Sequence, residues 1–209
     1  MRDDSQRDND DRWFVLGKGS LGCLWATMLR QCGCPVTLLV RDGNAGDSKA
    51  IELTYVPPTK DSNIGGAESG NFESENDARL QLTPTQASLK SVFQLEQSSP
   101  AALTQTNTPI DRLLIATKSY DAVTALNQVK ALLSDNARVI VLCNGLGFHQ
   151  NLYEQLQASS QTIEFYVGVT SEGALLQSDS VVRHTGRGLT RIGTYAPPQP
   201  HRSTAAPSV

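Results

Sequence analysis

The segment from residue 13 to residue 40 contains an apolar stretch, a glycine-rich turn, an amphipathic stretch and a second apolar stretch. The turn reads G-x-G-x-x-G, with its glycines at Gly17, Gly19 and Gly22. In such a turn the first glycine permits the tight bend, the second leaves the backbone open to close approach, and the third lets a helix pack on the strand. The segment therefore predicts a βαβ unit, whose two strands lie parallel in one sheet.

The amphipathic stretch predicts a helix over residues 20–31. Its apolar side chains recur at helical spacing at Leu21, Leu24, Trp25, Met28 and Leu29. The N-terminus of this helix presents free N–H groups and a partial positive charge to the turn, which suits a pyrophosphate. The sequence thus predicts a dinucleotide site, and the alternative is a glycine turn needed only for packing. The expected ligands are Gly17, Lys18, Gly19, Ser20, Leu21 and Gly22.

The end of the second apolar stretch bears on which dinucleotide binds. An arginine at this position pairs with the 2′-phosphate of NADP, whereas an acid holds the ribose hydroxyls of NAD. Here Arg41 comes first and Asp42 follows it. The guanidinium of Arg41 and the charge of Lys18 favour NADP(H). Asp42 leaves NAD as the alternative, and a solvent-exposed strand end is the other interpretation of Arg41.

The rest of the chain alternates apolar strand-like and helix-like stretches, which predicts an α/β, Rossmann-like, doubly wound and mostly parallel sheet. Two alternating stretches, residues 181–185 and 189–193, are joined by Gly186-Arg187-Gly188 and predict a C-terminal hairpin. Strands are expected over residues 51–56, 91–95, 113–116, 139–143 and 165–169, and helices over 122–132 and 151–157.

Four polar segments lie outside this pattern. Residues 1–12 are expected to form a disordered leader, and residues 195–209 a disordered tail. Residues 61–77 have the composition of a flexible insertion, and residues 98–108 that of a polar loop. The domain organisation predicted is one dinucleotide-binding domain over residues 13–194.

Composition limits the function classes. The chain has 209 residues and a formal net charge of −3, so no basic excess points to nucleic acid. No apolar run approaches the roughly 20 residues of a membrane span, and the charged N-terminus lacks the apolar core of a signal peptide. These features predict a cytoplasmic, reduced protein. Cys32-Gly-Cys34 lacks a second ligand pair, so we expect helix-end packing there and no metal site.

Several polar residues follow expected strands and should meet at the carboxyl edge of the sheet. Lys118 is expected to contact either ribose hydroxyls or a substrate carboxylate. The alternative is that it is a solvated lysine before a helix. Asn144 is placed to contact the nicotinamide or the substrate, or else forms a turn. The three histidines have no partners at a telling spacing and are expected to be structural or exposed. Glu172 has no evident partner either.

Five motifs in order resemble those of the ketopantoate reductase (2-dehydropantoate 2-reductase) family. They are Gly17-Lys18-Gly19-Ser20-Leu21-Gly22, Arg41, Thr117-Lys118-Ser119-Tyr120-Asp121-Ala122, Asn144-Gly145-Leu146-Gly147, and Thr170-Ser171-Glu172-Gly173-Ala174 with the later Thr190-Arg191-Ile192-Gly193. The resemblance implies NADPH-dependent reduction of 2-dehydropantoate to pantoate, a step of pantothenate synthesis. It also implies that Lys118 and Asn144 lie at the cleft, next to cofactor and substrate, and that Ala174 lies near the cofactor.

The chain departs from this family in one large respect. The family has a helical C-terminal domain that supplies the proton-donating lysine, and no residue of this chain matches that lysine, so no catalytic residue is identified. The partners expected are a small 2-oxo acid and either a second copy of the chain or that helical domain. The alternatives are a non-catalytic NADP-binding protein or subunit, and a dehydrogenase of another small hydroxy acid.

Overall fold

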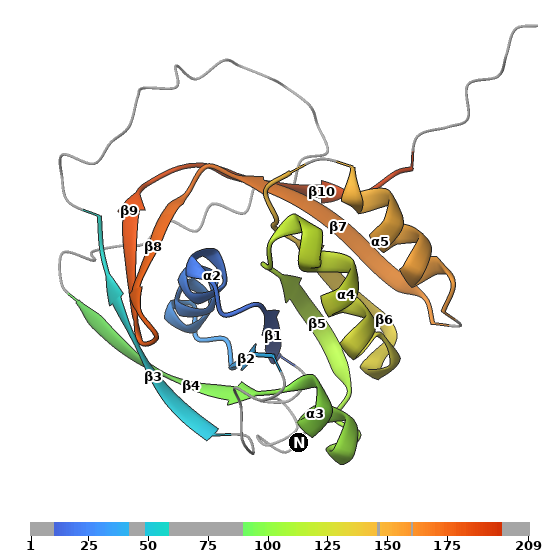
Figure 1. Cartoon of the computed structure of the whole chain (residues 1–209), viewed down its shortest axis with the longest axis horizontal. Coiled ribbons are helices and arrows are strands. Elements are labelled where there is room, and N and C mark those ends of the chain that lie inside the picture. The colour runs from blue at the N-terminus through green and yellow to red at the C-terminus, as the bar shows by residue number, and fades with distance from the viewer. Residues whose placement is uncertain (1–10, 42–48, 59–89, 146, 160, 198–209) are drawn as a thin grey trace, which may run out of the picture.

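The computed structural model describes residues 11–41, 49–58, 90–145, 147–159 and 161–197. Within these ranges the strands form one sheet in the order β10-β7-β6-β5-β1-β2-β4-β3-β9-β8 (Figure 1). The six strands from β7 to β4 are mutually parallel, so the predicted α/β, doubly wound and mostly parallel sheet is confirmed. Their bounds are β1 Trp13–Leu16, β2 Val36–Leu39, β4 Ser91–Ser98, β5 Ile110–Ile115, β6 Leu133–Val141 and β7 Ile163–Thr170.

The predicted βαβ unit forms the centre of the sheet. Strand β1 pairs with β2 on one side and with β5 on the other, and α2 (Ser20–Gln31) connects β1 to β2. All four residues of β2 are buried, as expected for a parallel strand covered on both faces. The apolar face of α2 supplies Leu24, Trp25 and Met28 to a core shared with Val15 and Leu38.

The opposite face of the sheet carries three helices. These are α3 (Pro100–Thr106), α4 (Ser119–Val129), which continues into the 3₁₀ turn Lys130–Leu132, and α5 (Phe148–Gln157). In Figure 1, α4 and α5 lie next to each other over β5, β6 and β7. The second core forms between these helices and the sheet, and Leu126, Val129 and Leu152 are fully buried in it.

Beyond β4 the sheet has mixed strand directions and curls around α2. Strands β3 (Lys49–Val56), β9 (Val181–Gly186) and β8 (Gly173–Ser178) continue the sheet beyond β4. Figure 1 shows α2 inside this curve, with β8 and β9 facing it. The helix is therefore enclosed by both the parallel and the mixed parts of the sheet.

The sheet has a C-terminal antiparallel hairpin, but its strands are not those that the sequence predicts. Strand β9 pairs with β8, whereas β10 (Thr190–Thr194) pairs with β7 at the opposite edge. The segment between β9 and β10 therefore crosses to the other edge of the sheet and does not form a tight turn. On the way, the backbone N–H of Ser171 donates to the carbonyl of Leu189, and a Cβ at Gly188 would overlap the backbone of Ser171. In Gly186-Arg187-Gly188 the chain passes close to the backbone at Ser171, where a side chain at Gly188 would not fit. A glycine needed for such a close approach looks the same in sequence as a glycine in a hairpin turn.

The polar loop expected over residues 98–108 contains helix α3. Ser99 caps this helix by accepting a hydrogen bond from the backbone N–H of Ala102 at 3.2 Å, and Pro100 occupies its first turn. Only Pro100 and Leu103 of the helix are buried. The helix lacks an apolar stripe, so periodicity could not reveal it.

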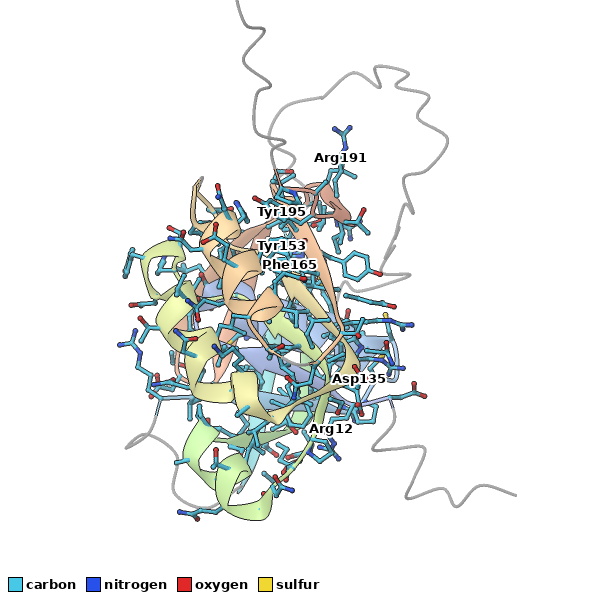
Figure 2. The ribbon with its side chains drawn as sticks, turned by 90° about the vertical axis from the view of Figure 1, so that its right-hand side faces the viewer. Arg12, Asp135, Tyr153, Phe165, Arg191 and Tyr195 are labelled. Atoms are coloured by element: carbon cyan, nitrogen blue, oxygen red, sulfur yellow. The ribbon has the colours of Figure 1, made fainter. Side chains whose placement is uncertain are left out.

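Arg12 and Tyr195, which the sequence analysis assigned to the leader and to the tail, both contact strands of the sheet. Arg12 hydrogen-bonds to Thr37 at 2.9 Å and pairs with Glu96. Tyr195 packs edge-on against Phe165, with ring centroids 5.6 Å apart, and against Tyr153, as Figure 2 shows. The predicted insertion over residues 61–77, together with residues 1–10 and 198–209 of the predicted leader and tail, lies outside the described residues.

Candidate functional site: a groove at the carboxyl edge of the sheet

An open groove of about 990 Å³ lies where β1, β2, β4 and β5 end. Carboxyl ends of parallel strands at a reversal of strand order are where α/β sheets bind ligands. The groove is lined mainly by the glycine turn, the end of β2, the start of α4 and the residue after β6. Its lining includes the predicted site residues Gly17, Lys18, Gly19, Ser20, Leu21, Arg41, Lys118 and Asn144.

The three glycines of the turn have different surroundings. Gly17 has a φ of +116°, which disfavours any side chain. A Cβ at Gly22 would overlap the carbonyl oxygen of Gly17, so helix and turn could not approach as they do. Gly19 has an ordinary φ of −89°, and no atom of the described residues beyond its chain neighbours lies within 4 Å of the place a Cβ would take. Packing therefore explains Gly17 and Gly22 but leaves the absence of a side chain at Gly19 unexplained.

The N-terminus of α2 opens into this space. Gly19 is its N-cap residue, no side chain caps the helix, and its first turn contains no acidic residue. Ser20 and Leu21 line the groove together with Lys18. Unpaired N–H groups, a helix dipole and a lysine thus make this end of the groove attractive to an anion.

Arg41 extends from the end of β2 across the groove. Its Nη2 donates to Oδ2 of Asp121, in the first turn of α4, at 2.7 Å. The Arg41 side chain is 77% exposed and that of Asp121 is 34% exposed. An exposed pair of this kind is worth little, about 0–1 kcal/mol, so Arg41 can exchange its partner for an incoming phosphate at small cost. The sequence did not identify Asp121 as a partner of Arg41.

The other end of the groove is formed by residues that follow β5 and β6. Lys118 is the N-cap residue of α4, with extended backbone and no side-chain cap, and Asn144 is exposed beyond β6. Cys143, just before Asn144, is buried, and burial raises the pKa of its thiol to about 11. It is therefore an inert core residue at neutral pH. The polar groups that line the groove here include the ammonium of Lys118 and the amide of Asn144.

Two of the predicted site residues, Gly22 and Ala174, do not line the groove. Gly22 packs against the glycine turn. Ala174 lies farther along the chain, in β8 opposite His184, and packs on the core around α2. Asp42 and Leu146 lie outside the described residues. Conversely, Asp179, in the turn between β8 and β9, lines the groove although no sequence pattern predicts it there. The curl of the sheet brings that turn over the N-terminal half of α2.

A second polar cluster, formed by His184, Glu172 and Tyr55, lies away from the groove lining. In it His184 is buried and hydrogen-bonded, as a structural histidine would be. His184 is 2% exposed, with Nε2 at 2.6 Å from Oε2 of Glu172 and Nδ1 at 3.0 Å from the hydroxyl of Tyr55. The backbone N–H of Gly188 also donates to Glu172, at 3.0 Å. Burial raises the pKa of Glu172, but these hydrogen bonds and the nearby charge of Arg187 outweigh it and leave that pKa below its ordinary value. Glu172 is thus paired, contrary to the expectation from sequence.

Neither a membrane span nor a metal site is found in the part of the chain that the structure describes. None of its helices combines the length and the apolar composition needed to cross a bilayer. No three of its His, Cys, Asp or Glu side chains lie where they could share a metal ion.

The fold is that of a Rossmann-like α/β domain, with an open groove at the carboxyl edge of its sheet. The family model "Ketopantoate reductase PanE/ApbA" matches residues 13–197, and the chain belongs to that family. A 2-dehydropantoate 2-reductase of Pyrococcus horikoshii is 28% identical over 182 residues, which are 87% of this chain and 47% of that protein. The chain spans about half the length of the curated relatives that match most of it.

Solved structures share the fold. The 2-dehydropantoate 2-reductase from Geobacter metallireducens superposes with a TM-score of 0.57 at 18% identity, covering 91% of this chain and 52% of that chain. D-mandelate dehydrogenase, solved with NADH and anilino(oxo)acetate, gives a TM-score of 0.54 at 19% identity, covering 85% of this chain and 46% of that chain. Both likenesses extend over about half of the longer chains.

Proposed function

We propose that this chain is the NADPH-binding part of a 2-oxo acid reductase whose substrate is 2-dehydropantoate. The single observation that carries the proposal is the uncapped N-terminus of α2 beside the open space at Gly19, in a chain of this family. A cradle that a Cβ would fill, lined by free N–H groups, fits a pyrophosphate.

Each part of the groove has a task in this proposal. The N–H groups of Ser20 and Leu21 bind the pyrophosphate, and Lys18 adds positive charge near it. Arg41 leaves Asp121 and pairs with the 2′-phosphate. Lys118 and Asn144, at the far end, orient the nicotinamide ribose and the 2-oxo acid. NADPH, when bound, supplies the hydride.

Reduction of a ketone also requires a donor within hydrogen-bond reach of the carbonyl oxygen, where negative charge develops. Within the described groove lining, Lys118 is the cation nearest the expected substrate end. We infer that the 209-residue chain binds NADPH but reduces 2-dehydropantoate slowly, because the family's donor lysine belongs to a helical domain that this sequence does not match. A specific activity equal to that of a full-length reductase would refute this inference.

NADH is the specific alternative to NADPH, and one contact favours it. The carboxylate of Asp121 stands beside the guanidinium that would hold the 2′-phosphate, where it could instead accept hydrogen bonds from ribose hydroxyls. Titration calorimetry with NADPH and NADH decides between them. We expect tighter binding of NADPH, and equal affinities would exclude Arg41 as a phosphate ligand. If neither dinucleotide binds, the proposed function is wrong.

A further inference from the structure

Gln97 is a buried polar residue at the end of β4 that no part of the proposed function uses. It is 2% exposed and lines the groove. Its Oε1 has no hydrogen-bond partner among the described residues. Buried polar side chains are nearly always hydrogen-bonded, because burial without a partner costs free energy. An unpaired amide at the wall of a binding groove therefore points to a partner that enters the groove.

The strand position of Gln97 would suit an apolar residue. Side chains alternate along a strand, so Gln97 shares a face with Phe93 and Leu95, which pack in the core around α2. Its register partner in β2 is Leu38, which is fully buried in the same core. A leucine or methionine would fill this place without an unpaired oxygen. The amide thus lowers stability unless a ligand pairs with it.

The order of the strands indicates which part of a dinucleotide reaches Gln97. From β5 to β4 the order is β5-β1-β2-β4. Lys118 follows β5, the pyrophosphate cradle follows β1, and Arg41 follows β2. Gln97 comes next, beyond the residue proposed for the 2′-phosphate and at the opposite end from the substrate. The next group in the ligand beyond the 2′-phosphorylated ribose is adenine.

We propose that Gln97 recognises the adenine ring of the cofactor, with its amide accepting from the exocyclic N6 amino group. Adenine presents that amino donor beside a ring-nitrogen acceptor, and a glutamine amide carries the matching acceptor and donor. This inference rests on the proposed function, because it places adenine by the same orientation of the cofactor. It assigns Gln97 to base recognition, a task that neither the glycine turn nor Arg41 performs.

The test compares NADP⁺ with 1,N6-etheno-NADP⁺, in which an added ring blocks both N6 and N1, by calorimetry on the full chain. We expect the unsubstituted protein to prefer NADP⁺ by about tenfold (about 1.4 kcal/mol). Gln97→Met, which keeps the length of the side chain but removes its hydrogen-bonding groups, should bind both ligands with nearly equal affinity. The matched control is Gln94→Leu, on the same strand but exposed and paired with Glu52; it should keep the preference.

The thermal midpoint without ligand separates recognition from a structural role. Gln97→Met should keep or raise this midpoint, because an unpaired buried oxygen is removed. Gln97→Leu provides a second variant with the same expectation. A preference for NADP⁺ that persists in both variants, or a midpoint that falls in both, would overturn the assignment. Absence of binding of either nucleotide to the unsubstituted protein would instead overturn the proposed function.

Discussion

Gly19→Ala is the sharpest test of the groove, because it separates binding from folding. The backbone at Gly19 has a φ of −89° and a ψ of −178°, which alanine adopts freely. Apart from its chain neighbours, no described residue has an atom within 4 Å of the added methyl group. Loss of glycine at an N-cap costs up to about 1 kcal/mol. The lower chain entropy of alanine in the unfolded state returns about 0.4–1 kcal/mol. The free energy of unfolding should therefore change by less than about 1 kcal/mol.

Dinucleotide binding should respond far more strongly. The methyl group enters the space proposed for the pyrophosphate and separates at least one N–H group of the α2 N-terminus from a phosphate oxygen. A hydrogen bond to a charged group contributes about 1.5–3 kcal/mol, and each 1.4 kcal/mol is tenfold in affinity. We expect the Kd for NADPH to rise about 10- to 100-fold.

Calorimetric titration gives the affinity of Gly19→Ala for NADPH, and urea unfolding gives its stability. Gly193→Ala is the matched control, because Gly193 lies in β10, outside the groove lining, and also has open space around its Cβ position. It should leave the Kd unchanged and, because no helix cap is lost, should keep the free energy of unfolding or raise it by at most about 1 kcal/mol. An unaltered Kd in Gly19→Ala would refute the assignment of this turn to the pyrophosphate.

Three further predictions concern charged residues. Arg41→Ala should weaken NADPH binding about tenfold and NADH binding little, since only NADPH carries the 2′-phosphate; equal losses in calorimetry would contradict this. Asp121→Asn should increase the preference for NADPH over NADH, because it removes a carboxylate beside Arg41; an unchanged ratio of the two Kd values would show that Asp121 does not affect specificity. The lowered pKa of Glu172 means that its ionised form stabilises the fold above its ordinary pKa, and that this stabilisation is lost as the pH falls through the folded-state value. In urea unfolding, Glu172→Gln should thus lower the free energy of unfolding by about 1–3 kcal/mol at pH 7. At pH 3.5 the decrease should be smaller. An equal decrease at both pH values would contradict the pairing of Glu172 with His184.

The sequence by itself determined the central βαβ unit and the placement of several polar residues at one edge of the sheet. The signals for this unit are local: the glycine spacing, the apolar stripe of residues 20–31 and the two apolar strands. Each of them sets the backbone conformation of the same residues or of their close neighbours in the chain. They predicted the βαβ unit, and the position of Arg41 after the second strand placed it at the groove. Lys118 and Asn144 could be placed in the same way, because carboxyl ends of parallel strands meet at one edge.

Only the tertiary structure decided which distant residues pair. Asp121 meets Arg41 from 80 residues away, and His184 meets Tyr55 from 129 residues away. The pairing of β10 with β7, and the burial of Gln97 at the groove wall, likewise depend on the curl of the whole sheet around α2. Sequence patterns encode which face of a strand is buried, but the neighbours on that face are set by how all the strands are ordered and twisted.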